Sequence, residues 1–319
     1  MTVTAPAAVR TARLSDASLP PVDPTLPPWP GDLVRVRGAE LYVRRTPGPA
    51  GGEPAVYVHG LGGSATNWTD LAHLLSGRLA GEAVDLPGFG RSGPAPGQDY
   101  SPLGHARTVI AYLEQRGAEP VHLFGNSLGG AVTVLVAAAR PDLVRTLTLV
   151  SPALPSLRPR RGSDITLPLL LLPGLGRLVQ RRLDALPPER RARAVLELCF
   201  GDPSVVPDNR FDEAVEEVVR RRGVPWAMDA FTASLRGIAW SYAAPGTRSL
   251  WHQAARVQAP TLVVWGDQDK VVSAAIAPRT AATIPDARLL LLPGVGHVAM
   301  METPDTVARA VVALLEDAG

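Results

Sequence analysis

The 319-residue sequence is poor in cysteine and in lysine, and each shortage narrows the class of protein. Cys199 is the only cysteine, so no internal disulfide can form and a reducing compartment is permitted. Of the 32 basic residues only Lys270 is a lysine, a bias that is typical of a GC-rich genome. The arginines form no long basic block and have no interleaved aromatic stripe, which argues against a nucleic-acid surface.

The sequence also lacks a membrane-spanning run, a secretory signal and a metal-binding motif. Its most apolar stretch, residues 167–179, is interrupted by two prolines and two glycines, and no stable membrane insertion is expected. The N-terminus has no charged-then-apolar signal pattern. His, Cys, Asp and Glu show no ligand spacing, so we expect no metal and no organic cofactor. These absences predict a soluble, cytoplasmic protein, in which Cys199 is a buried structural thiol.

What the sequence does have is an apolar fraction of 46%, enough for a substantial core. Short apolar runs alternate with helical patterns, and the runs are not themselves alternating in polarity. This pattern favours a parallel sheet covered on both faces. We therefore predict an α/β fold with a mostly parallel, doubly wound eight-stranded sheet. The expected strands are 33–37, 41–45, 55–58, 83–85, 120–124, 146–150, 260–265 and 287–292.

Two stretches fall outside this alternation. Residues 1–31 are rich in proline and predict a largely irregular N-terminal arm. Residues 151–248, which we name the cap segment, predict helices over 187–200, 209–222 and 225–242. This helical insertion follows the sixth strand, so the core comprises 32–150 and 249–319. Residues 167–175 are too apolar for a solvent loop, and either pack on the core or line an apolar pocket.

A Gly-x-Ser-x-Gly pentapeptide centred on Ser127 follows the fifth predicted strand. A serine on a sharp strand-to-helix turn is held in a strained backbone conformation, and Gly125 and Gly129 leave room for the neighbouring chain. Its hydroxyl then stands at a helix N-terminus, where negative charge is favoured. Such pentapeptides also occur by chance, with an incidental serine. The pattern indicates a nucleophile only if the chain also supplies a base and an acid.

Loops after later strands offer both groups. An acid stands at Asp267 or Asp269, and His297 follows the last strand. Serine needs an imidazole to take its proton, and the imidazole needs a carboxylate to fix its tautomer. In parallel sheets the carboxyl ends of the strands meet at one edge, so these loops should converge.

With these motifs in order, the chain resembles an α/β-hydrolase-fold serine hydrolase over residues 32–316. The order Ser, Asp, His is that of this family. The resemblance is carried by His59-Gly60-Leu61-Gly62, Asp85 to Ser92, Gly125 to Gly129, Gly266 to Asp269, and Gly296-His297 with Glu302 and Pro304.

The resemblance implies a role for each matching residue. Ser127 is the expected nucleophile and His297 the base, and the family's acid spacing selects Asp269 over Asp267. The backbone N–H groups of Leu61 and Leu128 are expected to form the oxyanion hole. Two neighbours of the triad are expected to contact substrate. They are Asn126 and Val298.

The function expected from the resemblance is cleavage of a small carboxylic ester with an apolar acyl or alcohol group. Asn126 before the serine is also similar to hydrolases that cleave carbon–carbon bonds in ring-fission products. Those enzymes typically have an aromatic residue after the catalytic histidine, where this chain has Val298. A ligand receptor built on the same fold is a third alternative.

Overall fold

The computed structural model describes residues 9–94, 97, 99–117, 119–156, 182 and 185–318. Within them a single sheet has nine strands, in the order β1-β9-β8-β7-β6-β4-β5-β3-β2. Only β3 runs antiparallel to its neighbours, β2 and β5, so the sheet is mostly parallel. The strands are β1 Arg10–Thr11, β2 Gly31–Val36, β3 Ala39–Thr46, β4 Glu53–Val58, β5 Leu79–Val84, β6 Val121–Asn126, β7 Val144–Val150, β8 Thr261–Gly266 and β9 Ala287–Leu292.

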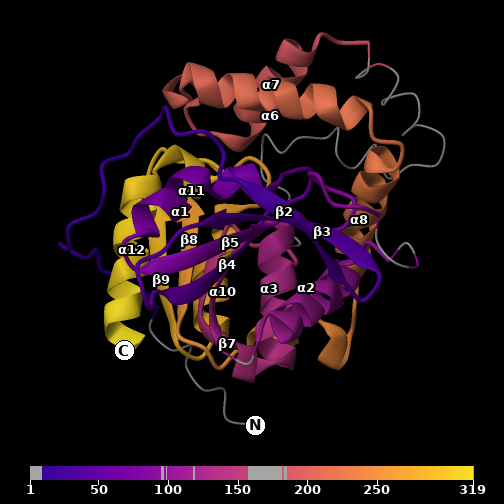
Figure 1. Cartoon of the computed structure of the whole chain (residues 1–319). Coiled ribbons are helices and arrows are strands. Elements are labelled where there is room, and N and C mark those ends of the chain that lie inside the picture. The colour runs from indigo at the N-terminus through magenta and orange to yellow at the C-terminus, as the bar shows by residue number, and fades with distance from the viewer. Residues whose placement is uncertain are drawn as a thin grey trace.

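Helices cover both faces of this sheet (Figure 1). One face packs against α2, α3, α9 and α10, and the other packs against α1, α11 and α12. The helices are α1 Thr69–Leu75, α2 Pro102–Arg116, α3 Leu128–Ala139, α6 Pro188–Cys199, α7 Asp208–Arg222, α8 Ala227–Tyr242, α9 Leu250–Ala254, α10 Ala277–Thr283, α11 Ala299–Glu302 and α12 Pro304–Ala318.

The apolar runs in the strands explain the two covered faces. In β8, Val263 and Trp265 point into the core on the α3 side, while Leu262 and Val264 point to the α12 side. Successive side chains of a strand face opposite sides, so a strand buried on both faces is apolar throughout. The prediction of a doubly wound α/β sheet is confirmed.

Three short elements were not expected from the sequence. The ninth strand, β1, belongs to the N-terminal arm predicted as irregular, and it pairs in parallel with β9. Helices α9 and α11 are five and four residues long. Elements this short show no hydrophobic periodicity, so tertiary contacts determine whether they form. The apolar run 167–175 lies outside the described residues, and the division into arm, core and cap segment stays a prediction.

The described part of the arm is bound along the core. The Ser15 hydroxyl donates to the Glu316 carboxylate at 2.7 Å, and the Trp29 indole donates to the Thr69 carbonyl oxygen at 3.3 Å. Between them, the Leu26 carbonyl oxygen accepts from Arg210 of α7 at 2.9 Å. The arm thus joins α12, α1 and the cap segment.

Three described helices of the cap segment surround one side of the core. In Figure 1, α6 and α7 lie together above α1 and α11, and α8 runs down beside α2. Strands β6, β7, β8 and β9 run in parallel, so their carboxyl ends share one edge of the sheet. Across the described ranges, none of the helices combines the length and the apolar character that crossing a bilayer requires.

Candidate active site

Ser127 stands on the turn between β6 and α3. Its backbone has φ 54° and ψ −117°, a conformation with positive φ that a residue with a side chain rarely adopts. A Cβ on Gly129 would stand 2.2 Å from the carbonyl oxygen of Val58, and one on Gly125 would stand 2.5 Å from that of Gly129. Both glycines are therefore required by the close approach of backbone around the serine.

His297 and Asp269 meet at the same edge. The Nδ1 atom of His297 lies 2.8 Å from Oδ2 of Asp269, and both side chains are buried. The other carboxylate oxygen, Oδ1, accepts from the N–H groups of Val271 and Val272 at 2.8 and 2.9 Å. The acid is thus oriented by its own loop, and the hydrogen bond leaves Nε2 of the imidazole for a reacting group.

The pKa of the Asp269 carboxyl lies below its ordinary value. Burial acts to raise it, but the facing His297 and the N–H of Val272 together outweigh burial and favour the charged form. The Ser151 hydroxyl acts in the same direction. Asp269 therefore remains a carboxylate throughout the neutral range.

Asp267, the other candidate acid, is occupied elsewhere. Its Oδ1 accepts from the N–H of Gly294 at 2.8 Å, and the side chain is partly exposed. That hydrogen bond ties the end of β8 to the loop that follows β9. The structure thus brings Asp269, and not Asp267, to His297.

The glycine loop after β4 lies directly against the serine turn. A Cβ on Gly60 would stand 3.0 Å from Cβ of Ser127, so the loop that carries Leu61 approaches the serine turn closely. Leu128 begins α3, so its N–H is one of the helix's free first donors. His59 has a structural place in this loop: its Nδ1 bonds the Gly60 carbonyl oxygen at 2.7 Å, and its Nε2 accepts from Leu86 at 2.9 Å.

Asn126 and Val298, the two predicted substrate contacts, are both buried. The Asn126 amide donates to the carbonyl oxygens of Val150 and His297, each at 3.1 Å. It thereby joins the serine turn to the histidine loop. Val298 packs in the apolar cluster on the α12 side. A contact of either residue with substrate stays a prediction.

Two side chains of the cap segment reach the glycine loop. Arg221 of α7 donates to the Gly62 carbonyl oxygen, and the Phe231 ring of α8 packs against Gly62. A cavity of about 10 Å³, room for about one water molecule, lies between them and the loop at Gly88 to Gly90. The cap segment therefore lies directly over the predicted oxyanion loop.

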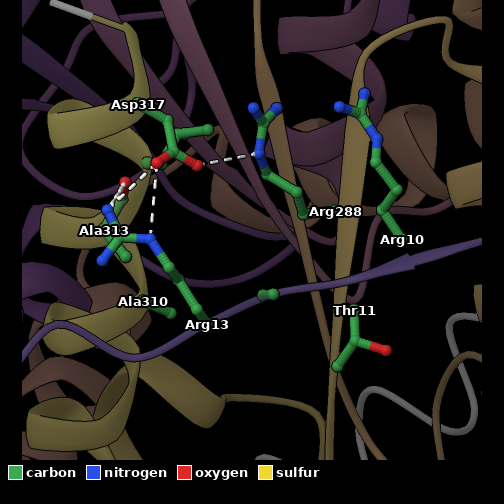
Figure 2. A pocket seen from close by; sticks show the side chains of 9 residues that line it. Arg10, Thr11, Arg13, Arg288, Ala310, Ala313 and Asp317 are labelled. Atoms are coloured by element: carbon green, nitrogen blue, oxygen red, sulfur yellow. Dashed lines mark hydrogen bonds and ion pairs between the residues drawn. The ribbon is translucent and has the colours of Figure 1, made fainter.

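A larger pocket, of about 350 Å³, lies at the β1 edge of the sheet, where the arm crosses β9 and α12. Figure 2 shows Arg13 and Arg288 directed at Asp317 from two sides, and Arg10 parallel to Arg288. Arg10 pairs in turn with Asp286. These ion pairs place the pocket at the contact between arm and core, with none of the three candidate triad residues in its lining.

Neither a metal site nor a second nucleophile emerges from the described side chains. No three His, Cys, Asp or Glu residues among them are placed to hold a metal ion. Cys199, expected to be buried, is half-buried at the end of α6. Burial of its sulfur raises the pKa of the thiol to about 12, so the reactive thiolate is scarce.

Ser151, which follows β7, was not among the residues predicted from the sequence. It is fully buried, has φ 47°, and its hydroxyl favours the charged form of Asp269. Its position directly after an apolar strand was the available signal, because the ends of β6, β8 and β9 carry the three candidate triad residues. The serine has no recognisable motif around it, which is why the sequence alone did not reveal it.

Comparison with known families gives one match to this architecture. The family described as the alpha/beta hydrolase fold matches residues 54–304, which include all three candidate triad residues. A relative from Pseudomonas putida, the dihydrolipoyllysine-residue acetyltransferase component of an acetoin cleaving system, is 31% identical over 271 residues. That match covers 84% of this chain and 65% of the relative, so the chain spans about two thirds of the relative's length.

Two further similarities concern hydrolases. A 2-hydroxy-6-oxononadienedioate/2-hydroxy-6-oxononatrienedioate hydrolase from Cupriavidus pinatubonensis is 28% identical, with 83% of this chain and 88% of that protein covered. A solved structure of a membrane phospholipase A, described as a bacterial virulence factor, superposes with a TM-score of 0.70. It is 26% identical, and the match covers 91% of this chain and 86% of that one.

Proposed function

The chain belongs to the α/β-hydrolase fold family, and from that membership we propose that it is a serine hydrolase of carboxylic esters with an apolar acyl or alcohol group. The proposal is carried by one observation: the 2.8 Å contact of His297 with Asp269 at the sheet edge where Ser127 holds positive φ. A carboxylate-oriented imidazole and a serine on a strained strand-to-helix turn are two of the geometric features that support an activated serine.

The proposed reaction has two halves. The Ser127 hydroxyl attacks the ester carbonyl while Nε2 of His297 accepts its proton, and the N–H groups of Leu61 and Leu128 bind the oxyanion. The imidazolium then gives this proton to the departing alcohol, which leaves an acyl group on Ser127. Water then attacks the acyl group while its proton passes to His297, and the imidazolium returns that proton to Ser127 Oγ as the C–Oγ bond breaks and the acid is released. Asp269 stays ionised and stabilises the imidazolium in both halves.

A carbon–carbon bond hydrolase is the second candidate. It is supported by the 28% identical relative named for 2-hydroxy-6-oxo dioate substrates and by Asn126 directly before the serine. Against it, both donors of the Asn126 amide point at backbone carbonyls, where they serve the turn rather than a ligand. The name phospholipase A on the structural neighbour supports ester cleavage.

Ser127→Ala tests the proposal. The wild type should hydrolyse p-nitrophenyl butyrate and become labelled at Ser127 by a fluorophosphonate probe, and the variant should do neither. Loss of the serine in a triad costs on the order of 10⁶ in kcat in a well-studied protease. A wild-type chain that neither turns over the ester nor reacts with the probe would refute the serine hydrolase and favour a ligand receptor on the same fold.

A further inference from the structure

The end of helix α6 meets the loop that carries His297. The backbone N–H of His297 donates to the Cys199 carbonyl oxygen at 2.6 Å. A Cβ on Gly296 would stand 2.3 Å from that same oxygen, and one on Gly201 would stand 2.1 Å from the carbonyl oxygen of Gly294. The two backbones therefore approach so closely that only glycine fits on either side. We name this contact, residues 199–202 against 294–297, the histidine seam.

The Glu302 carboxylate closes the histidine seam. Its Oε2 atom accepts from the N–H of Gly296 at 2.8 Å and from that of Gly201 at 3.1 Å. Its Oε1 atom accepts from the N–H of Asp202 at 3.0 Å. One side chain thus binds the residue before the proposed base and two residues of the cap segment. Hydrogen bonds to a charged acceptor are about twice as strong as neutral ones.

Lys270 makes a second attachment, at the residue after Asp269. Its ammonium donates to the carbonyl oxygens of Glu197 at 2.7 Å and Phe200 at 3.1 Å. The last carbonyls of a helix have no partner within it and carry partial negative charge, so a cation there is favourable. This is the one lysine in a chain that otherwise uses arginine. A compact ammonium with rotatable donors suits two carbonyls better than a planar guanidinium.

From these contacts we infer that Glu302 is a positioning residue for His297. Together with Lys270 it fastens the end of α6 to the loops that carry Asp269 and His297, so that the cap segment sets the orientation of the imidazole. This inference rests on the proposed function of those two residues. Small displacements of a catalytic group cost rate more than binding, because the reaction needs alignment that the bound substrate does not.

The test compares four variants by kcat and KM on p-nitrophenyl butyrate, by thermal midpoint, and by amide hydrogen exchange over residues 294–302. Glu302→Ala should lower kcat by roughly 10- to 100-fold with KM changed less than about twofold. Exchange at the His297 amide should become faster. Glu302→Gln should recover most of the kcat, because its amide oxygen still accepts from Gly296 and Gly201. Lys270→Met, which keeps the apolar stem, should lower kcat by about 3- to 10-fold.

Glu53→Ala is the matched control. The Glu53 carboxylate also ties separate elements together, since it binds His122 of β6 and Arg145 of β7, but it lies at the opposite end of these strands. It should lower the thermal midpoint and leave kcat unchanged.

Three results would overturn the inference: a kcat of Glu302→Ala within twofold of the wild type, a loss in Glu302→Gln as large as in Glu302→Ala, or an equal loss in Glu53→Ala. If Glu302→Ala does not fold, Glu302→Gln and Lys270→Met decide the matter. Failure of the wild type to hydrolyse esters would refute only the proposed function. Amide exchange at His297 in Glu302→Ala would still test the contact: faster exchange would support it, and unchanged exchange would contradict it.

Discussion

The Asp269 carboxylate has both oxygens assigned, one to two backbone N–H groups and one to His297. A carboxylate held in this way accepts the proton of Nδ1 and keeps Nε2 free to act as a base. The lowered pKa of Asp269 also means that the carboxylate stabilises the fold at every pH above its ordinary value. That contribution is lost only as the pH falls through the lower folded-state value.

Asp269→Asn should lower kcat by roughly 10⁴-fold, because the amide can present a donor to Nδ1 and stabilise the wrong tautomer. Stopped-flow hydrolysis of p-nitrophenyl butyrate measures the change. Asp267→Asn is the control, since an asparagine oxygen still accepts from Gly294, and its kcat should stay within about twofold of the wild type. A larger loss of kcat at position 267 than at position 269 would show that Asp267, and not Asp269, is the acid.

Burial of His105 makes the stability of the fold depend on pH. It is fully buried in α2, its Nε2 lies 3.1 Å from the Ser234 hydroxyl of α8, and burial lowers its pKa to about 3. Between pH 6.5 and that value the unfolded chain binds a proton here and the folded chain does not. Folding stability therefore falls as the pH is lowered through this window.

His105→Gln should flatten this dependence. The wild type should lose about 1.4 kcal/mol per pH unit at this site between pH 6 and 4, and the glutamine variant should lack that share of the slope. Urea unfolding at a series of pH values measures this slope. An unaltered slope in His105→Gln would mean that the folded chain also protonates at His105.

At the scale of elements, Arg210 joins three parts of the chain. Its guanidinium pairs with Asp70 of α1 and with Glu213 of its own helix, and it donates to the Leu26 carbonyl oxygen of the arm. Its side chain is only 6% exposed. Burial raises the pKa of Glu213, so the pair depends on the arginine for its charge balance. Removing one partner of a buried pair leaves uncompensated charge.

Arg210→Met should destabilise the fold by about 2–3 kcal/mol, below the usual range for a fully buried pair because both carboxylates are partly exposed. Arg35→Met removes an ion pair with Glu40 at a position where the arginine is 86% exposed, and should cost less than about 0.5 kcal/mol. Chemical denaturation of both variants gives the comparison. Equal costs would show that α7 is not held to α1 and the arm by Arg210.

At the scale of the whole molecule, we propose that the cap segment over the glycine loop determines which acyl groups reach Ser127. If that space is apolar, each methylene buried should add about 0.8 kcal/mol to binding, or about fourfold in kcat/KM. A series of p-nitrophenyl esters from acetate to octanoate should therefore show kcat/KM rising with chain length. Preference for the shortest ester would contradict an apolar site, and faster cleavage of a vinylogous 1,5-diketo acid than of any ester would favour the carbon–carbon hydrolase.

The sequence by itself determined the fold and the order of the candidate site. Apolar runs such as 261–265 can be buried only in a sheet covered on both faces. The turn at Ser127 leaves no room for a side chain at Gly125 or Gly129. Local patterns of this kind depend only on residues that are close in the sequence. The family's spacing already selected Asp269 as the acid, and the tertiary structure decided what depends on distant partners: that Asp267 faces Gly294, that Ser151 lies beside the acid, and that β1 joins the sheet edge. It also joined Glu302 to the end of α6, a contact across 100 residues of chain. No local pattern encodes such contacts, because they arise only when the packed sheet brings separate loops to one edge.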